Sequence, residues 1–232
     1  MAPSNGSRLL LAMALCIGAV ALSSCSQAEP IPEPTPEPSS QKLVSLDSDQ
    51  LQRKLADFTS SDKNAVVLSD QQLRSTIPKA QEWLESIKVN PSKCGVTFAQ
   101  PVADQLKNAT MAAVEFEGRH LTVAIYKDEQ LLRKHWETKN AANEQCSRYS
   151  VTANGERRAY HLAEQALDSD ADHDEASVST SSNGKSTQQQ LVVSSSNSNV
   201  LIGLQQSTTP SQTKQQIQAA QSTINELLKT LK

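Results

Sequence analysis

The sequence predicts an α+β fold, a single domain in which an antiparallel sheet is flanked by helices. Strand-like segments separated by turn signals fill most of residues 111–206. Segments with helical periodicity stand before, within and after this series, at residues 51–58, 78–87, 128–143 and 212–231. Runs of strands with separate helices, rather than alternating β-α-β units, are typical of antiparallel α+β domains.

Residues 1–24 have the features of a secretory signal. Arg8 precedes an apolar run at residues 9–21, which is short for a bilayer span of about 20 apolar residues. Small residues then lead into a cysteine, and Leu22-Ser23-Ser24-Cys25 resembles the lipobox of bacterial lipoproteins. The resemblance implies cleavage before Cys25 and a lipid on its sulfur, with palmitate among the expected acyl groups. The alternative is an ordinary signal peptide followed by an incidental cysteine.

The lipidated Cys25 would open a tether at residues 25–41, where every second residue between positions 29 and 38 is proline and three of the others are glutamate. Proline lacks an amide donor and favours an extended polyproline helix, so this stretch predicts a stiff spacer of about 3 Å per residue. The globular domain is then predicted to span residues 42–232.

The charge balance argues against a nucleic-acid partner. The net charge is −3, and removal of the signal, in which Arg8 is the only charged residue, changes it to −4. No basic run is present that could follow a phosphate backbone. The predicted partner is instead the membrane, through the lipid on Cys25, at the extracytoplasmic face of the cell membrane.

Two cysteines remain for the domain, because Cys16 leaves with the signal and Cys25 carries the lipid. Cys94 and Cys146 form an even pair in an oxidising compartment, which favours a disulfide. A zinc site would need a Cys-x-x-Cys motif or histidines at fixed spacing, and neither is present in the sequence.

The first two helices have local signals. Leu51, Leu55 and Phe58 repeat at helical spacing after candidate capping residues at positions 47 and 49. The second helix has Pro78 in its first turn and ends before Asn90-Pro91. Its apolar face is predicted to hold Ala80, Trp83, Leu84 and Ile87.

Strands and turns alternate through the centre of the chain. Glycine-containing turns are predicted at Gly118, at Asn154-Gly155 and at Asn183-Gly184. The helix beginning after Asp128 is predicted to bury Leu132, Trp136 and either Leu131 or His135. The predicted strands are 111–117, 121–126, 147–153, 157–167, 176–180, 189–195 and 200–206. The inner face of the last helix is predicted to hold Ile217, Ala220, Ile224, Leu227, Leu228 and Leu231.

Two short motifs suggest ligands but are explained by turns and loops. Gly184-Lys185-Ser186-Thr187 resembles the end of a phosphate-binding loop, which would also need a glycine where Ser179 stands. Asp168, Asp170 and Asp172 alternate as in a calcium loop, but the required glycine and glutamate are absent, at position 173 and at Ser179 respectively. A turn and a solvated acidic loop are the preferred interpretations.

No catalytic, metal-binding or cofactor-binding set emerges from the remaining residues. The four histidines, at positions 120, 135, 161 and 173, are isolated, and no serine lies in a Gly-x-Ser-x-Gly motif. We therefore expect a protein that is not an enzyme and that needs no cofactor or metal.

The segment from Trp136 to Cys146, with Cys94 upstream, carries a family resemblance. The chain is similar to actinobacterial lipoproteins and kinase ectodomains of the PknH-like sensor type, over about residues 42–232. The resemblance implies an antiparallel sheet flanked by helices, with a cleft for an extracellular ligand that is unidentified.

The sequence therefore predicts a lipid-anchored, non-enzymatic sensor-like domain that binds a small or envelope-derived ligand. A carrier of lipid or glycolipid and a surface protein-interaction module are the alternatives. The residues that bind the ligand and the type of cell envelope are left open.

Overall fold

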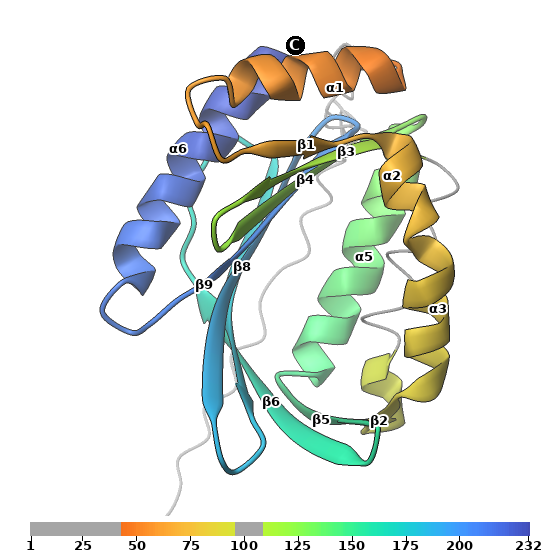
Figure 1. Ribbon diagram of the computed structural model, residues 1–232, viewed down its shortest axis with the longest axis vertical. Helices are drawn as coiled ribbons and strands as arrows, with labels where there is room; N and C mark the ends of the chain where they lie inside the picture. Colours follow the sequence, from red (N-terminus) through yellow and green to blue (C-terminus); the bar gives the residue numbers. More distant parts are fainter. Residues whose placement is uncertain (1–42, 96–108) are drawn as a thin grey trace, which may run out of the picture. The chain divides into compact units, whose positions relative to one another are not determined.

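The computed structural model describes residues 43–95 and 109–232. These residues lie within the compact unit Gln41–Lys232 and form one antiparallel sheet with helices on both of its faces (Figure 1). The α+β class and the single sheet domain are therefore confirmed. The predicted signal, the predicted tether and Cys25 lie outside the described residues.

The nine strands of the described residues run in the order β1-β3-β4-β9-β8-β7-β6-β5-β2. Tight turns at Gly118, Gly155 and Gly184 join neighbouring strands, with φ angles of 72°, 80° and 81°, which glycine adopts at little cost. The strands are β1 (Val66–Leu68), β2 (Lys88–Asn90), β3 (Ala109–Phe116), β4 (Arg119–Tyr126), β5 (Arg148–Ala153), β6 (Glu156–Gln165), β7 (His173–Ser182), β8 (Thr187–Asn197) and β9 (Val200–Ser207).

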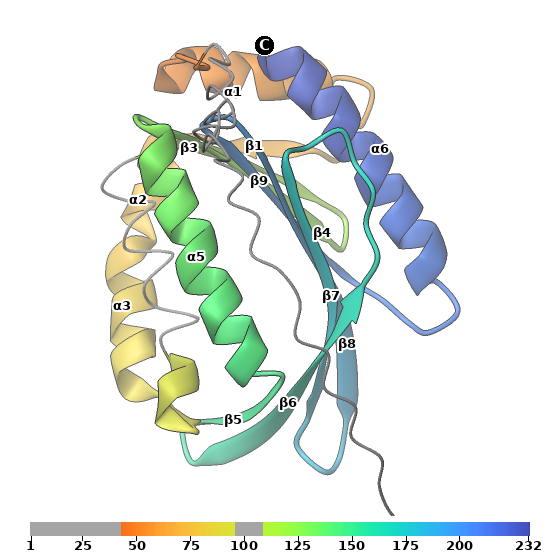
Figure 2. The same ribbon diagram turned by 180° about the vertical axis from the view of Figure 1, so that it is seen from behind.

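Helices cover the two faces of the sheet in separate groups. Helices α1 and α6 lie on one face, and α5 lies on the other with α2 and α3 beside it (Figures 1 and 2). No helix in the described ranges is both long and apolar enough to cross a membrane. The helices are α1 (Ser48–Phe58), α2 (Asp70–Ser75), α3 (Ile77–Ser86), α5 (Glu129–Gln145) and α6 (Thr213–Leu231), with a short 3₁₀ helix η1 (Ser92–Gly95) after β2.

The larger core lies between the sheet and the pair α1 and α6. Asp47 and Gln50 form a capping box that starts α1 and presents Leu51 and Leu55 to the sheet. All six residues predicted for the inner face of α6 face this core; five are buried, and Ile217 is half-buried and packs against the core. The strand residues in this core include Val114, Leu121, Val123, Ala176, Val178, Leu191, Val193, Ile202 and Leu204.

A second, smaller core lies under α5. Leu132 and Trp136 pack against Met111, Tyr126 and Leu201, and the indole Nε1 of Trp136 donates to the Ser196 hydroxyl at 2.7 Å. His135, rather than Leu131, is the further buried member of the helix face. The sequence had left these two residues as alternatives.

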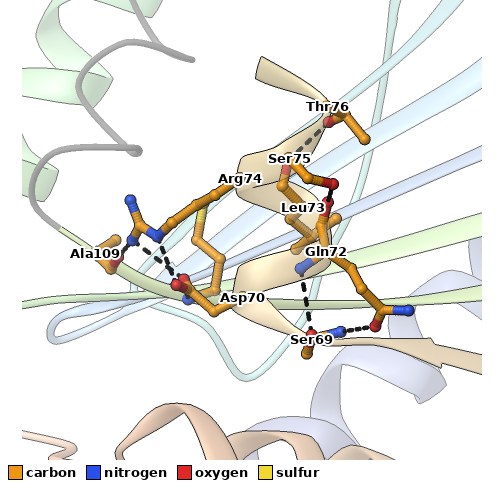
Figure 3. A network of polar contacts seen from close by, with 9 residues as sticks. Ser69, Asp70, Gln72, Leu73, Arg74, Ser75, Thr76 and Ala109 are labelled. Carbon is orange, nitrogen blue, oxygen red and sulfur yellow. Dashed lines mark hydrogen bonds and ion pairs between the residues drawn. The ribbon is translucent and has the colours of Figure 1, made fainter. Parts of the chain in front are cut away.

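Helix α2 is attached to β3 by a polar network (Figure 3). Ser69 and Gln72 form its capping box, and the Asp70 carboxylate pairs with the Arg74 guanidinium. Asp70 also accepts from the backbone N–H of Met111 at 2.9 Å, and Arg74 donates to the carbonyl of Ala109 at 2.9 Å. This attachment fixes the start of α3, which follows α2 directly.

The elements β1, α2 and β2 were not predicted from the sequence. Each strand has only three residues and is held by pairing with a distant partner, β1 with β3 and β2 with β5. The apolar face predicted for α3 is also incorrect in one respect, because Trp83 is 47% exposed. A short segment has too little local periodicity to reveal a strand that depends on its partner.

The sheet continues beyond the end of α6. On the α6 face of β7, Ala176 and Val178 belong to the larger core, whereas Thr180 and Ser182 lie further along the strand, outside it. Figure 1 shows β5, β6 and the β7–β8 hairpin extending past α6. We call β2, β5, β6 and the β7–β8 hairpin the open end of the sheet.

Candidate functional site

The α6 face of the open end carries basic and hydroxyl side chains in rows across the strands. The backbone register places Arg148 opposite His161, and His161 opposite Thr180. Directly opposed residues in antiparallel strands have Cβ atoms about 4.5–5.5 Å apart, so the side chains of a row are neighbours. The three rows together form what we call the basic face: Lys88–Thr152–Arg157, Asn90–Ser150–Ala159–Ser182 and Arg148–His161–Thr180.

A pocket of about 580 Å³ lies on the basic face. Arg148, Arg157 and His161 line it together with the hydroxyls of Thr180 and Ser182, and no carboxylate lines it. The rim is completed by Asn90 and Pro91, which are joined by a cis peptide bond. We call this hollow the basic pocket.

One arginine of the basic pocket is held in position. The guanidinium Nε of Arg157 donates to the Ser150 hydroxyl at 3.1 Å, and Ser150 is buried. Ser150 belongs to the row next to that of Arg157. The hydrogen bond therefore directs the Arg157 side chain toward the middle row of the basic face. Its remaining N–H groups stay available, since one hydrogen bond uses one of the five donors of a guanidinium.

Two tyrosines stack at the same pocket. The rings of Tyr149 and Tyr160 lie 5.0 Å apart between centroids with an interplanar angle of 4°. Burial raises the pKa of the Tyr149 hydroxyl to about 12, and the nearby Tyr160 adds to the shift. Tyr149 is therefore a neutral phenol at physiological pH.

The opposite face of β5 and β6 carries a second pocket, of about 490 Å³. The exposed Trp83 of α3 lines it together with Asn154, Glu156, Arg158 and Tyr160. Tyr160 therefore borders pockets on both faces of the open end. We call this hollow the Trp83 pocket. The sequence predicts Trp83 on the apolar face of its helix, and the structure places it instead beside residues of β5 and β6 that are distant in sequence.

The predicted cysteine pair is found at the open end. Cys94 in η1 and Cys146 after α5 are buried, with their Sγ atoms 2.15 Å apart and their Cα atoms 5.6 Å apart, as in a disulfide. The bond connects the segment after β2 to the segment before β5. It thereby fixes both sides of the basic pocket next to Asn90 and Arg148.

A partly buried charge cluster lies beneath α5, away from the pockets. Lys139 donates to the Ser194 hydroxyl at 2.7 Å, lies 3.2 Å from the Glu175 carboxylate and sits 4.9 Å from the Trp136 ring. Burial lowers the pKa of Lys139, and the interaction with Glu175 opposes the shift. The cluster connects α5 to β7 and β8.

The contact between Lys139 and Ser194 resembles a serine–lysine catalytic dyad in distance only. Catalysis needs a neutral lysine that accepts the serine proton. Burial favours the neutral form of Lys139 by lowering its pKa, and the Glu175 carboxylate 3.2 Å away opposes this shift. Ser194 also lies inside β8, paired with β7 and β9 on both sides. The ladder therefore occupies the neighbouring backbone groups, which leaves no pair of N–H donors for an oxyanion.

The other motifs of the sequence are placed as loops or strands. The Asn183 side chain accepts from the backbone N–H groups of Lys185 and Ser186, which is a turn rather than a phosphate-binding loop. Asp170 pairs with Lys229, and Asp172 accepts from the N–H of Ser198. Within the described ranges, no group of three or more His, Cys, Asp or Glu residues could hold a metal ion.

The four histidines are not brought together. His120 lies in β4 opposite a glutamate, and His161 lines the basic pocket. The rings of His135 and His173 lie 6.1 and 5.9 Å from the Trp136 ring. His161 is therefore the one histidine that the structure places in a described pocket.

An apolar pocket of about 610 Å³ lies where the described domain begins and ends in sequence. It is lined by Leu43, Val200, Leu228 and Leu231, with Lys232 at its edge. Its lining has more aliphatic side chains than that of the basic pocket, although Ser45, Ser198 and Lys232 also contribute to it.

Comparisons with known proteins show weak structural likenesses. The chain matches no known family model and no curated protein sequence. The extracellular domain of PknH from Mycobacterium tuberculosis is 12% identical, with a TM-score of 0.45, over 62% of this chain and 78% of that chain. A putative uncharacterised protein from Mycobacterium smegmatis, an Rv0999 ortholog, is 14% identical, with a TM-score of 0.41, over 77% of this chain and 95% of that chain. At these values neither likeness establishes membership of a family or identifies a ligand.

Proposed function

We propose that this chain is a lipid-anchored, non-enzymatic, extracytoplasmic domain that binds a ligand at the open end of its sheet. The observation that carries the proposal is that β5 and β6 have a pocket on each face, one on the face that α6 leaves uncovered and one beside Trp83 of α3. Specific ligand sites are concave and combine apolar or aromatic surface with a few convergent polar groups. The basic pocket and the Trp83 pocket both have this composition.

The anchor of the proposed protein is the lipid on Cys25. A diacylglyceryl group contributes two acyl chains, and each buried methylene adds about 0.8 kcal/mol of membrane affinity. A Cys25→Ala variant should therefore move from the membrane fraction to the soluble extracytoplasmic fraction. Retention of the variant in the membrane would contradict lipid anchoring and would leave the binding role unaffected.

Native mass spectrometry of the full chain, purified from its own host in a neutral detergent, tests the binding role. We expect a bound mass that is lost in variants of the open end and retained in variants of α1 exposed to solvent. A chain that carries no adduct, and that retains none from an extract of its own envelope, would contradict the proposal.

A lipid carrier is the second candidate, because the apolar pocket offers aliphatic walls to an acyl chain. Leu43 is 44% exposed at this pocket, so Leu43→Asp places a charge there with little risk to folding. A lipid adduct that this substitution removes, and that open-end variants keep, would favour the carrier over the binding domain proposed above.

A further inference from the structure

We propose that the basic pocket binds a phosphate-bearing ligand, an assignment that rests on the binding role proposed for the open end. The chain has 25 acidic and 22 basic residues, yet the rows of the basic face contain Lys88, Arg148 and Arg157 and no Asp or Glu. The same strand β6 carries Glu156 and Glu164 on its other face. The acidic residues are therefore sorted away from this face.

The arginines of the basic face have no counter-charge among the residues that the structure describes. Among the described residues, Arg148 and Arg157 have no carboxylate within ion-pair distance. Arg148 also stands directly opposite His161, a pairing of two basic side chains that adds no stability of its own. An anion seated between the two side chains would supply the missing counter-charge.

The pocket is organised before any ligand arrives. Arg157 is oriented by the buried Ser150 hydroxyl, and the Cys94–Cys146 disulfide holds the chain on both sides. A guanidinium whose direction is already fixed loses less entropy when it binds an oxyanion in a bidentate manner. The contact with Ser150 therefore gives Arg157, an exposed side chain, a preferred direction at the pocket.

The number and spread of donors favour phosphate over carboxylate. Two guanidinium groups, an imidazole and the hydroxyls of Thr180 and Ser182 line the pocket from three strands. A phosphate monoester offers three strong acceptor oxygens and a charge of about −1.5 to −2, whereas a carboxylate offers two oxygens and a single charge. The volume of about 580 Å³ leaves room for the group that carries the phosphate, next to the stacked tyrosines.

Ligand-observed phosphorus NMR of the full chain in a neutral detergent tests the assignment. Glycerol phosphate and a short-chain phosphatidylglycerol are the two phosphate probes, and glucuronate, added as a competitor, is the carboxylate probe. We expect line broadening of a phosphate probe with the wild-type chain and weaker competition by glucuronate. Stronger binding of glycerol phosphate indicates a free phosphate ester as the ligand, and stronger binding of the lipid indicates a headgroup.

Two double variants, each of which removes two positive charges, distinguish a specific site from general electrostatic attraction. Arg148→Gln/Arg157→Gln should weaken binding by about 10–100-fold, since each removes a charge-assisted hydrogen bond. Arg53→Gln/Arg133→Gln changes exposed arginines of α1 and α5 and should leave the affinity within about twofold. Equal weakening by both variants would overturn the assignment.

A charge-conserving variant tests the oriented arginine. Arg157→Lys keeps the charge but loses the fork and the bond to Ser150, so it should weaken binding even though the net charge is unchanged. Full affinity in Arg157→Lys would show that only net charge matters. It would contradict the claim that an oriented guanidinium binds the phosphate. Binding of neither phosphate probe would overturn the assignment as well, while an uncharged adduct in native mass spectrometry would leave the proposed binding role intact.

Discussion

Strand β7 passes through two different environments. Ala176 and Val178 are buried beneath α6, whereas Thr180 and Ser182, on the same face of the same strand, line or border the basic pocket. The covered half of the sheet is stabilised by apolar burial against helices. The open end has few fully buried side chains and is held by strand pairing, a disulfide and an aromatic stack. Strand residues that α6 does not cover are therefore the ones available for binding.

The disulfide should give the largest single effect on stability, because the open end has little core of its own. Closing a loop of 52 residues stabilises the fold by about 4 kcal/mol on the chain-entropy model. Denaturant unfolding of Cys94→Ser/Cys146→Ser should show a loss of this size. Reductant should destabilise the wild type and leave the variant unchanged, and equal stability of the two chains would contradict the account.

A matched pair of leucines compares the two halves directly. Leu204→Ala removes a fully buried side chain of β9 and should cost about 3 kcal/mol, within the usual range for core truncation. Leu162→Ala removes a half-buried side chain of β6 at the open end and should cost about 1 kcal/mol. Both values come from denaturant unfolding, and equal losses would remove the distinction between the halves.

The buried pair of Lys139 and Glu175 predicts a non-additive double variant. Lys139→Met leaves a largely buried carboxylate without its cation and should cost about 1–3 kcal/mol, whereas Lys139→Met/Glu175→Leu should be nearly neutral. A double-mutant cycle by denaturant unfolding measures the coupling. Additive losses would show that the two side chains do not act as a pair.

The lowered pKa of Lys139 gives the same pair a pH signature. Between the lowered value and the ordinary 10.5, the unfolded chain binds more protons at this residue than the folded chain does. The contribution of Lys139 to stability should therefore rise with pH across that window, and Lys139→Met should lack the rise. A constant difference between the two chains over that pH range would contradict the burial.

The tyrosine stack predicts a smaller effect at the open end. Because the pKa of Tyr149 is raised from 10.0 to about 12, the unfolded chain deprotonates first, and stability is lost as pH rises through this range. Tyrosinate absorbance should show a titration with a midpoint near 12 that Tyr149→Phe removes. Tyr160→Phe should lower that midpoint yet leave it above 10.0, since burial is the larger cause.

Elements with local sequence signals were predictable, and features that depend on strand pairing were not. The fold class and the long elements were predictable, because helices such as α6 and turns such as Asn183-Gly184 have local signals. The three-residue strands β1 and β2 have no such signal. The basic pocket was not predicted, because Arg148, His161 and Thr180 become neighbours only through the register of three strands.

Binding at the open end is tested most directly by hydrogen–deuterium exchange of the full chain with and without the ligand that co-purifies with it. We expect protection confined to β2, β5, β6 and the β7–β8 hairpin, with the amides near Arg148 and His161 protected most. Protection confined to α6 and the segment beginning at Leu43, with no change in β5 and β6, would contradict ligand binding at the open end and favour a lipid carrier.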